Sequence, residues 1–106
     1  MDVTTTESIP GRRITAIKGV ALGSTVRSKN LGKDIGAGLK SLVGGELKSY
    51  SHMLTEARSE ALSRMEAHAA ELGADSVVNL RFMTSAVAAG ASEILAYATA
   101  VTTERA

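Results

Sequence analysis

Two histidines, each with a carboxylate one helical turn away, are the residues of this 106-residue chain best suited to chemistry. Glu56 follows His52 by four residues and Glu71 follows His68 by three, so each pair shares one face of a helix. Imidazole and carboxylate bind divalent transition metals, but such a site takes three or four ligands at about 2 Å. His52 and Glu56 are therefore a two-ligand metal-binding fragment, with the missing ligands supplied by neighbouring subunits. The alternative is that both histidines are surface or packed residues.

The two histidines do not form one metal site within a single chain. Sixteen residues separate His52 from His68, which on one helix is about 160° of rotation and roughly 24 Å of rise. His68 also lies on the apolar stripe of that helix, which is typical of a packed residue.

Other reaction centres have little support in the sequence. The chain has no cysteine, which excludes thiolate nucleophiles, thiolate metal ligands and disulfides. The glycine-rich segment 32–45 has neither the Walker pattern nor the dinucleotide-binding pattern. Close packing and helix capping explain its glycines. The alternative is an anion site at the start of the next helix, formed by the amides after Gly44-Gly45 with Lys40 or Lys48 nearby. Asp34 and Tyr50 are the unusual polar residues, because each lies in or beside an apolar stripe.

Composition predicts one domain spanning residues 1–106 and no charged macromolecular partner. The net charge is +1 with both signs interspersed, so neither nucleic acid nor an anionic membrane is an expected partner. No apolar run approaches membrane-spanning length and the first residues do not resemble a signal peptide, so we expect a cytoplasmic protein. Only 3% of the residues are aromatic, and a core of small side chains is commonly supplemented by oligomerisation.

The elements that must position these residues are, in chain order, a strand, a short helix, a long helix and two further strands. Strands are predicted at residues 12–27, 75–84 and 92–103, a short helix at 30–42 and a long helix at 47–72, with a small-residue hairpin loop at 85–91. Gly19 and Gly23 predict a bulge or a close backbone approach in the first strand. This order predicts an α+β fold with an antiparallel sheet and one long and one short helix packed on it.

The long helix also predicts a partner surface. Apolar residues recur along it at three- and four-residue spacing, and Gly73 supplies a left-handed stop. A helix of about 26 residues is roughly 40 Å long, which is too long for one small domain to cover by itself.

Several short motifs together resemble the YbjQ family, also called the UPF0145 or "putative heavy-metal-binding" family. The matching segments run nearly end to end: Thr5-Thr6-Glu7-Ser8-Ile9-Pro10-Gly11; Asp34 with Val43-Gly44-Gly45; Tyr50; Glu56-Ala57-Arg58 with Ala61; Leu72-Gly73-Ala74-Asp75-Ser76-Val77-Val78; and Ala98-Thr99-Ala100-Val101. The resemblance implies a small α+β subunit of the dodecin-like type, assembled as a ring, with a homopentamer as the usual form. It implies no particular activity.

These observations lead to a non-enzymatic homo-oligomer that binds a divalent metal ion or small ligand at subunit interfaces. Its expected ligand-binding residues are Asp34, Glu46, Tyr50 and Arg58, which match the family signature. Asp34 would accept hydrogen bonds or bind a hard metal, and Arg58 would bind an anion, unless the two simply pair with each other. The alternatives are a structural scaffold without a ligand, and an enzyme with a site shared between subunits.

Overall fold

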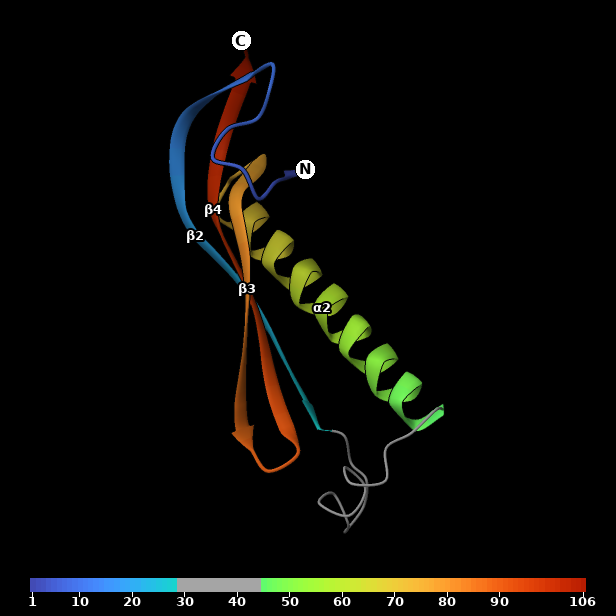
Figure 1. The fold of residues 1–106 in the computed structure, drawn as a ribbon. Coiled ribbons are helices and arrows are strands. Elements are labelled where there is room, and N and C mark those ends of the chain that lie inside the picture. Colours follow the sequence, from blue (N-terminus) through green and yellow to red (C-terminus); the bar gives the residue numbers. More distant parts are fainter. Residues whose placement is uncertain (29–44) are drawn as a thin grey trace.

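The computed structural model describes residues 1–28 and 45–106, with the backbone alone for residues 45–50. Within these residues the elements are β1 (Asp2–Val3), β2 (Arg12–Ser28), α2 (Gly45–Glu71), β3 (Ser76–Ala88) and β4 (Ala91–Arg105) (Figure 1). The strands form one sheet in the order β1-β3-β4-β2, and α2 packs on that sheet. The α+β class is as predicted. The predicted short helix at 30–42 lies outside the described residues.

The three predicted strands pair antiparallel, as expected, but a fourth strand makes the sheet mixed, which corrects the prediction of a wholly antiparallel sheet. β4 pairs antiparallel with both β2 and β3, but β1 pairs parallel with β3. This two-residue strand is too short to show an alternating side-chain pattern, which is why the polar start of the chain gives no signal for it. Backbone hydrogen bonds hold the segment in place; for example, the Thr4 N–H donates to Val77 O at 3.1 Å.

The β3–β4 hairpin is longer than predicted. Pairing continues to Ala88 opposite Ala91, so the connection is two residues rather than the seven of the predicted loop at 85–91. Gly90, with φ of 73°, adopts the left-handed conformation that this tight turn requires. Alanine and serine have low intrinsic strand preference, and the backbone pairing with β4 overrides it here.

The long helix agrees with the sequence prediction to within two residues at each end. It begins at Gly45 and ends at Glu71, against the predicted 47–72. Gly73 has a φ of 86°, and the Ala74 N–H donates to Ala69 O at 3.1 Å. This left-handed glycine with a hydrogen bond reaching back five residues is the Schellman ending.

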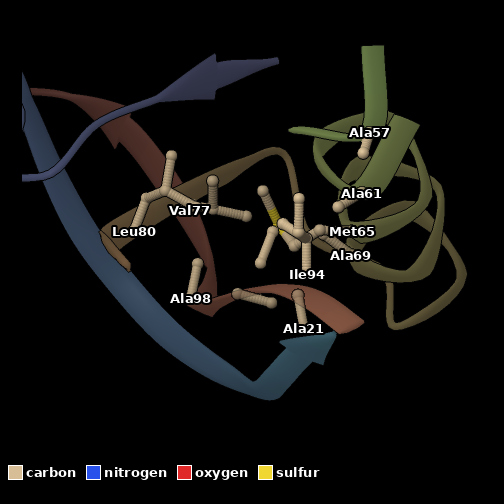
Figure 2. Close-up of a cluster of buried hydrophobic side chains, with 11 residues drawn as sticks. Ala21, Ala57, Ala61, Met65, Ala69, Val77, Leu80, Ile94 and Ala98 are labelled. Carbon is tan, nitrogen blue, oxygen red and sulfur yellow. The ribbon is translucent and has the colours of Figure 1, made fainter. Parts of the chain in front are cut away.

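The core lies between α2 and one face of the sheet, and small side chains dominate it (Figure 2). Its buried members are Ala21, Ala57, Ala61, Met65, Ala69, Val77, Leu80, Ile94, Ala96, Ala98 and Ala100. Because seven of these eleven are alanine, the helix backbone approaches the sheet closely.

The subunit is elongated, and no described element covers the far end of its β3–β4 hairpin. Its principal extents are 55 × 23 × 16 Å and its radius of gyration is 17.3 Å, whereas a compact chain of this length has about 13 Å. Figure 1 shows the far half of the β3–β4 hairpin diverging from α2. Residues 81–89 are all exposed. The subunit therefore buries one end of its hairpin and leaves the other in solvent.

Candidate functional site

Where α2 crosses β2, the backbones of the helix and the strand approach each other closely. At the centre of this crossing, the buried Gly23 has no side chain, and a Cβ there would lie 2.2 Å from both Ala61 O and Met65 N. Only glycine permits this approach of strand and helix backbones, which confirms the close contact predicted for Gly23.

Helix side chains cover the outer edge of β2 on both sides of this crossing. The Leu22 N–H donates to Nδ1 of His68 at 2.9 Å, and Nη1 of Arg64 donates to Ser24 O at 2.6 Å. Both backbone groups face away from β4, where a further strand would otherwise pair. Two side chains of α2 thus satisfy hydrogen-bonding groups that an edge strand leaves open.

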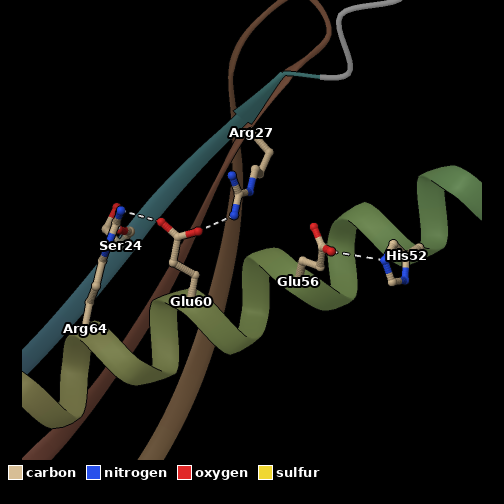
Figure 3. A network of polar contacts seen from close by, with 6 residues as sticks. All are labelled: Ser24, Arg27, His52, Glu56, Glu60 and Arg64. Atoms are coloured by element: carbon tan, nitrogen blue, oxygen red, sulfur yellow. Dashed lines mark hydrogen bonds and ion pairs between the residues drawn. The ribbon is translucent and has the colours of Figure 1, made fainter.

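Glu60 connects the same part of α2 to the end of β2 (Figure 3). Its carboxylate forms ion pairs with Arg27 from β2 and with Arg64 one turn along the helix. Ser24 also donates to Oε2 of Glu93 at 2.8 Å, which joins β2 to β4. Every charged group of this cluster has a partner of opposite charge or a hydroxyl partner. Such pairing is typical of a structural ion-pair network that holds a helix to a strand.

His52 and Glu56 form a separate pair one to two turns toward the start of α2 (Figure 3). Nε2 of His52 lies 3.0 Å from Oε1 of Glu56, and both side chains are more than half exposed. Two ligands of one tetrahedral zinc ion, each about 2.1 Å from the metal, lie roughly 3.4 Å apart. The two atoms therefore already have nearly the separation that one ion would require. Among the described residues no cluster of three metal-binding side chains is found.

The remaining predicted site residues are only partly described. Asp34 lies outside the described residues, so its pairing with Arg58 stays a prediction. Glu46 and Tyr50 lie in the first turns of α2, where only the backbone is described. Arg58 is exposed, and its Nη2 donates to Oγ1 of Thr55 at 3.3 Å. Of the predicted set, the structure brings His52 and Glu56 together.

Asp75, which the sequence does not single out as a functional residue, organises the end of the sheet next to the helix terminus. Its Oδ2 accepts from the Thr103 N–H at 3.0 Å, and its Oδ1 accepts from the hydroxyls of Thr103 at 3.0 Å and Ser76 at 2.9 Å. The Thr103 backbone hydrogen bond is the main cause that lowers the pKa of Asp75, against an opposing effect of desolvation, and the hydroxyls and the Arg12 guanidinium lower it further. These hydrogen bonds join the start of β3 to the end of β4, so we assign Asp75 a structural role.

The sheet face turned away from α2 carries an uncovered apolar surface. Because directly opposed residues share a face, the strand register places six apolar side chains there. We call this surface the outer sheet face; it comprises Val20, Leu22, Val26, Met83, Leu95 and Tyr97. The first four are exposed by 60%, 47%, 57% and 53%, and the last two are half-buried. A contiguous exposed apolar patch of this kind is typical of a protein–protein contact.

Within the described part of the chain the subunit offers no enclosed site. No pocket is found there, and none of the described helices is long and apolar enough to cross a membrane. Within these residues, the features that a ligand or a partner could contact include the exposed pair of His52 and Glu56 and the outer sheet face.

Comparisons with known proteins place the chain among small proteins of similar length. The family model YbjQ_1, described as "Putative heavy-metal-binding", matches residues 1–104. A UPF0145 protein of Vibrio campbellii is 57% identical over 95% of this chain and 97% of its own. A UPF0145 protein of Methanosarcina acetivorans is 59% identical over 95% of both chains.

A solved structure shares the fold. The crystal structure of a protein of unknown function from Pediococcus pentosaceus, assigned to the DUF74 family, matches with a TM-score of 0.66. It is 18% identical and the match covers 98% of each chain. The likeness extends over the whole subunit and concerns its architecture.

Proposed function

The chain belongs to the YbjQ family, and we propose that it is a non-enzymatic homo-oligomer whose subunits join through the outer sheet face. The observation that supports this most is the exposure of Val20, Val26 and Met83 on one continuous surface. Covering such apolar area is favourable by about 25 cal/mol per Å². A second copy is always present at the same concentration, so it is the natural cover. A ring of five subunits is the assembly that the family resemblance favours.

The elongated shape supports the same proposal. A chain with a radius of gyration of 17.3 Å leaves more surface in solvent than a compact chain of about 13 Å. Its core is also built mainly from alanine, which buries little area per side chain. Oligomer contacts would supply the apolar burial that a single subunit lacks.

Native mass spectrometry of wild-type protein and of Val20→Lys tests the proposal. The wild type should have a multiple of the subunit mass, and the lysine, placed on the outer sheet face, should shift it toward the monomer. Ala70→Lys puts the same charge on an exposed position of α2 and should retain the wild-type mass. A wild-type protein that is monomeric at micromolar concentration would contradict the proposal.

A divalent metal ion bound between subunits is a second candidate function, favoured by the 3.0 Å separation of His52 Nε2 and Glu56 Oε1. The donor set suits zinc, nickel or copper(II), since imidazole and carboxylate bind these ions. A chain without cysteine offers no thiolate, the ligand that softer metals prefer. A neighbouring subunit would have to contribute the remaining ligands. Asp34, Glu46, Tyr50 and Arg58 remain proposed ligand-binding positions.

Metal binding is tested by titrating zinc into the metal-free protein and measuring the bound metal per subunit. His52→Ala should abolish binding, whereas His68→Gln, which keeps a hydrogen-bond acceptor on the same helix, should bind as the wild type does. An assembled protein that binds no zinc, nickel or copper would favour a scaffold without a metal ligand.

A further inference from the structure

Each edge of the sheet has its outward backbone hydrogen-bonding groups covered along only part of its length. On β2, His68 and Arg64 cover the backbone groups of Leu22 and Ser24. On β3, the N-terminal segment covers the edge as far as Leu80, whose N–H donates to Thr4 O at 2.9 Å. Natural proteins protect sheet edges because an open edge can pair with another chain. The parts of both edges that lie nearest to the core have such protection.

Beyond Arg81, the direction of the β3 backbone groups follows from the strand register. The Leu22 N–H points away from β4, so Leu22 and its opposed residue Tyr97 are not hydrogen-bonded to each other. The backbone N–H and C=O groups of Tyr97 therefore point toward β3. Tyr97 is opposite Arg81, and hydrogen-bonding direction alternates along a strand. The backbone N–H and C=O groups of Met83 and Ser85 therefore face β4. Those of Phe82, Thr84 and Ala86 point away from β4, toward solvent.

This outward-facing stretch, residues 82–86, is the open β3 edge. Among the described residues no strand pairs with it, and a register shift at Ala86 ends it. It lacks the usual protection, since residues 82–91 contain neither a charged residue nor a proline. The open β3 edge is also continuous with the outer sheet face, because Met83 belongs to both.

We infer that a second copy of this chain adds a strand to the open β3 edge. The inference rests on the proposed homo-oligomer and names the backbone contact by which its subunits join. A neutral edge matches a neutral partner strand and offers nothing to nucleic acid or to a charged peptide. The side chain of Met83 lies on the outer sheet face beside this edge, so a copy that pairs with the edge also adjoins the proposed contact surface.

Thr84→Pro tests the inference, because proline removes the outward N–H while the hydrogen bonds of Met83 and Ser85 to β4 remain. Proline is tolerated on an edge strand whose N–H faces solvent, so the subunit should stay folded, as measured by the helical circular dichroism of α2. The assembly should dissociate at least about ten-fold more readily on dilution in size-exclusion chromatography with light scattering. Thr84→Ala, which keeps the N–H, should assemble as the wild type does.

Amide hydrogen exchange of the wild type provides a second measurement that does not depend on a variant. In the assembly, the Thr84 and Ala86 amides should exchange within about ten-fold of the rates of Met83 and Ser85, the matched amides bonded to β4. Exchange of Thr84 and Ala86 at the rate of free amides, or a Thr84→Pro protein that assembles normally, would overturn the inference while leaving the oligomer intact. A monomeric wild type would instead refute the proposed function. A native mass that contains a different protein would overturn the choice of a second copy as partner.

Discussion

Replacing Gly23 with alanine tests whether the contact between the backbones of β2 and α2 fixes the fold. The new Cβ would lie 2.2 Å from Ala61 O and Met65 N, whereas ordinary contact begins near 3.4 Å. The strand and the helix must then separate by about 1.2 Å (3.4 − 2.2). The neighbouring atoms belong to the helix backbone, so no side-chain rotation relieves the clash.

The expected destabilisation is large compared with the total stability of a domain. Overpacking of a core costs about 1–3 kcal/mol, and we place Gly23→Ala at or above about 3 kcal/mol because the helix must move as a unit away from a close-packed alanine core. At roughly 4–8 °C per kcal/mol for a domain of this size, the melting temperature should fall by about 12 °C or more.

Thermal unfolding followed by circular dichroism, at one fixed subunit concentration, measures this fall. Gly11→Ala is the matched control, because nothing lies within 4 Å of its Cβ and its φ of +78° adds backbone strain alone, which costs about 1–2 kcal/mol. Adding Ala61→Gly should not rescue Gly23→Ala, since the clash is with a backbone oxygen. A Gly23→Ala protein that melts within a few degrees of the wild type would refute the reasoning.

Two further predictions concern the polar contacts. The pKa of Asp75 in the folded protein is lowered below its ordinary 3.8. The stability that the Asp75 carboxylate contributes is therefore complete above pH 3.8 and is lost as the pH falls through the folded pKa. Asp75→Asn should lessen the decline of the melting temperature between about pH 5 and pH 2, and an unchanged slope would contradict this. His68→Leu leaves the Leu22 N–H without its acceptor and should destabilise the fold by about 1 kcal/mol more than His68→Gln, which keeps an acceptor; urea denaturation compares the two, and equal midpoints would argue against the hydrogen bond.

The sequence predicts well those features that recur along the chain. The three- and four-residue spacing that includes Ala57, Ala61 and Met65 indicates the helix and its packed face, and those residues are buried. Gly73 marks the helix end. Gly23 is predicted as a bulge or a close approach, and the structure identifies the close approach. The helix and its end have local causes, so the local pattern contains them, whereas only the structure identifies the segment of α2 that Gly23 approaches.

The features that the sequence misses depend on pairing between distant segments. Backbone pairing with β3 holds β1 in place. Backbone pairing between β3 and β4 likewise extends these two strands to Ala88 and Ala91. Asp75 becomes significant only when Thr103 lies opposite it. None of these contacts requires a particular side-chain period, so the pattern of polar and apolar residues does not report them.

The structure separates the two histidines, which look alike in the sequence, by the hydrogen bonds that they make. Nδ1 of His68 accepts a hydrogen bond from the Leu22 N–H, so the lone pair of this nitrogen is engaged and is not available to a metal. A metal-binding histidine has the opposite arrangement, because its second nitrogen donates to a neighbouring acceptor. His52 accepts no backbone hydrogen bond of this kind among the described residues, and its Nε2 faces a carboxylate. Of the two imidazoles on α2, that of His52 is therefore the one arranged to bind a metal, while His68 holds the edge of β2.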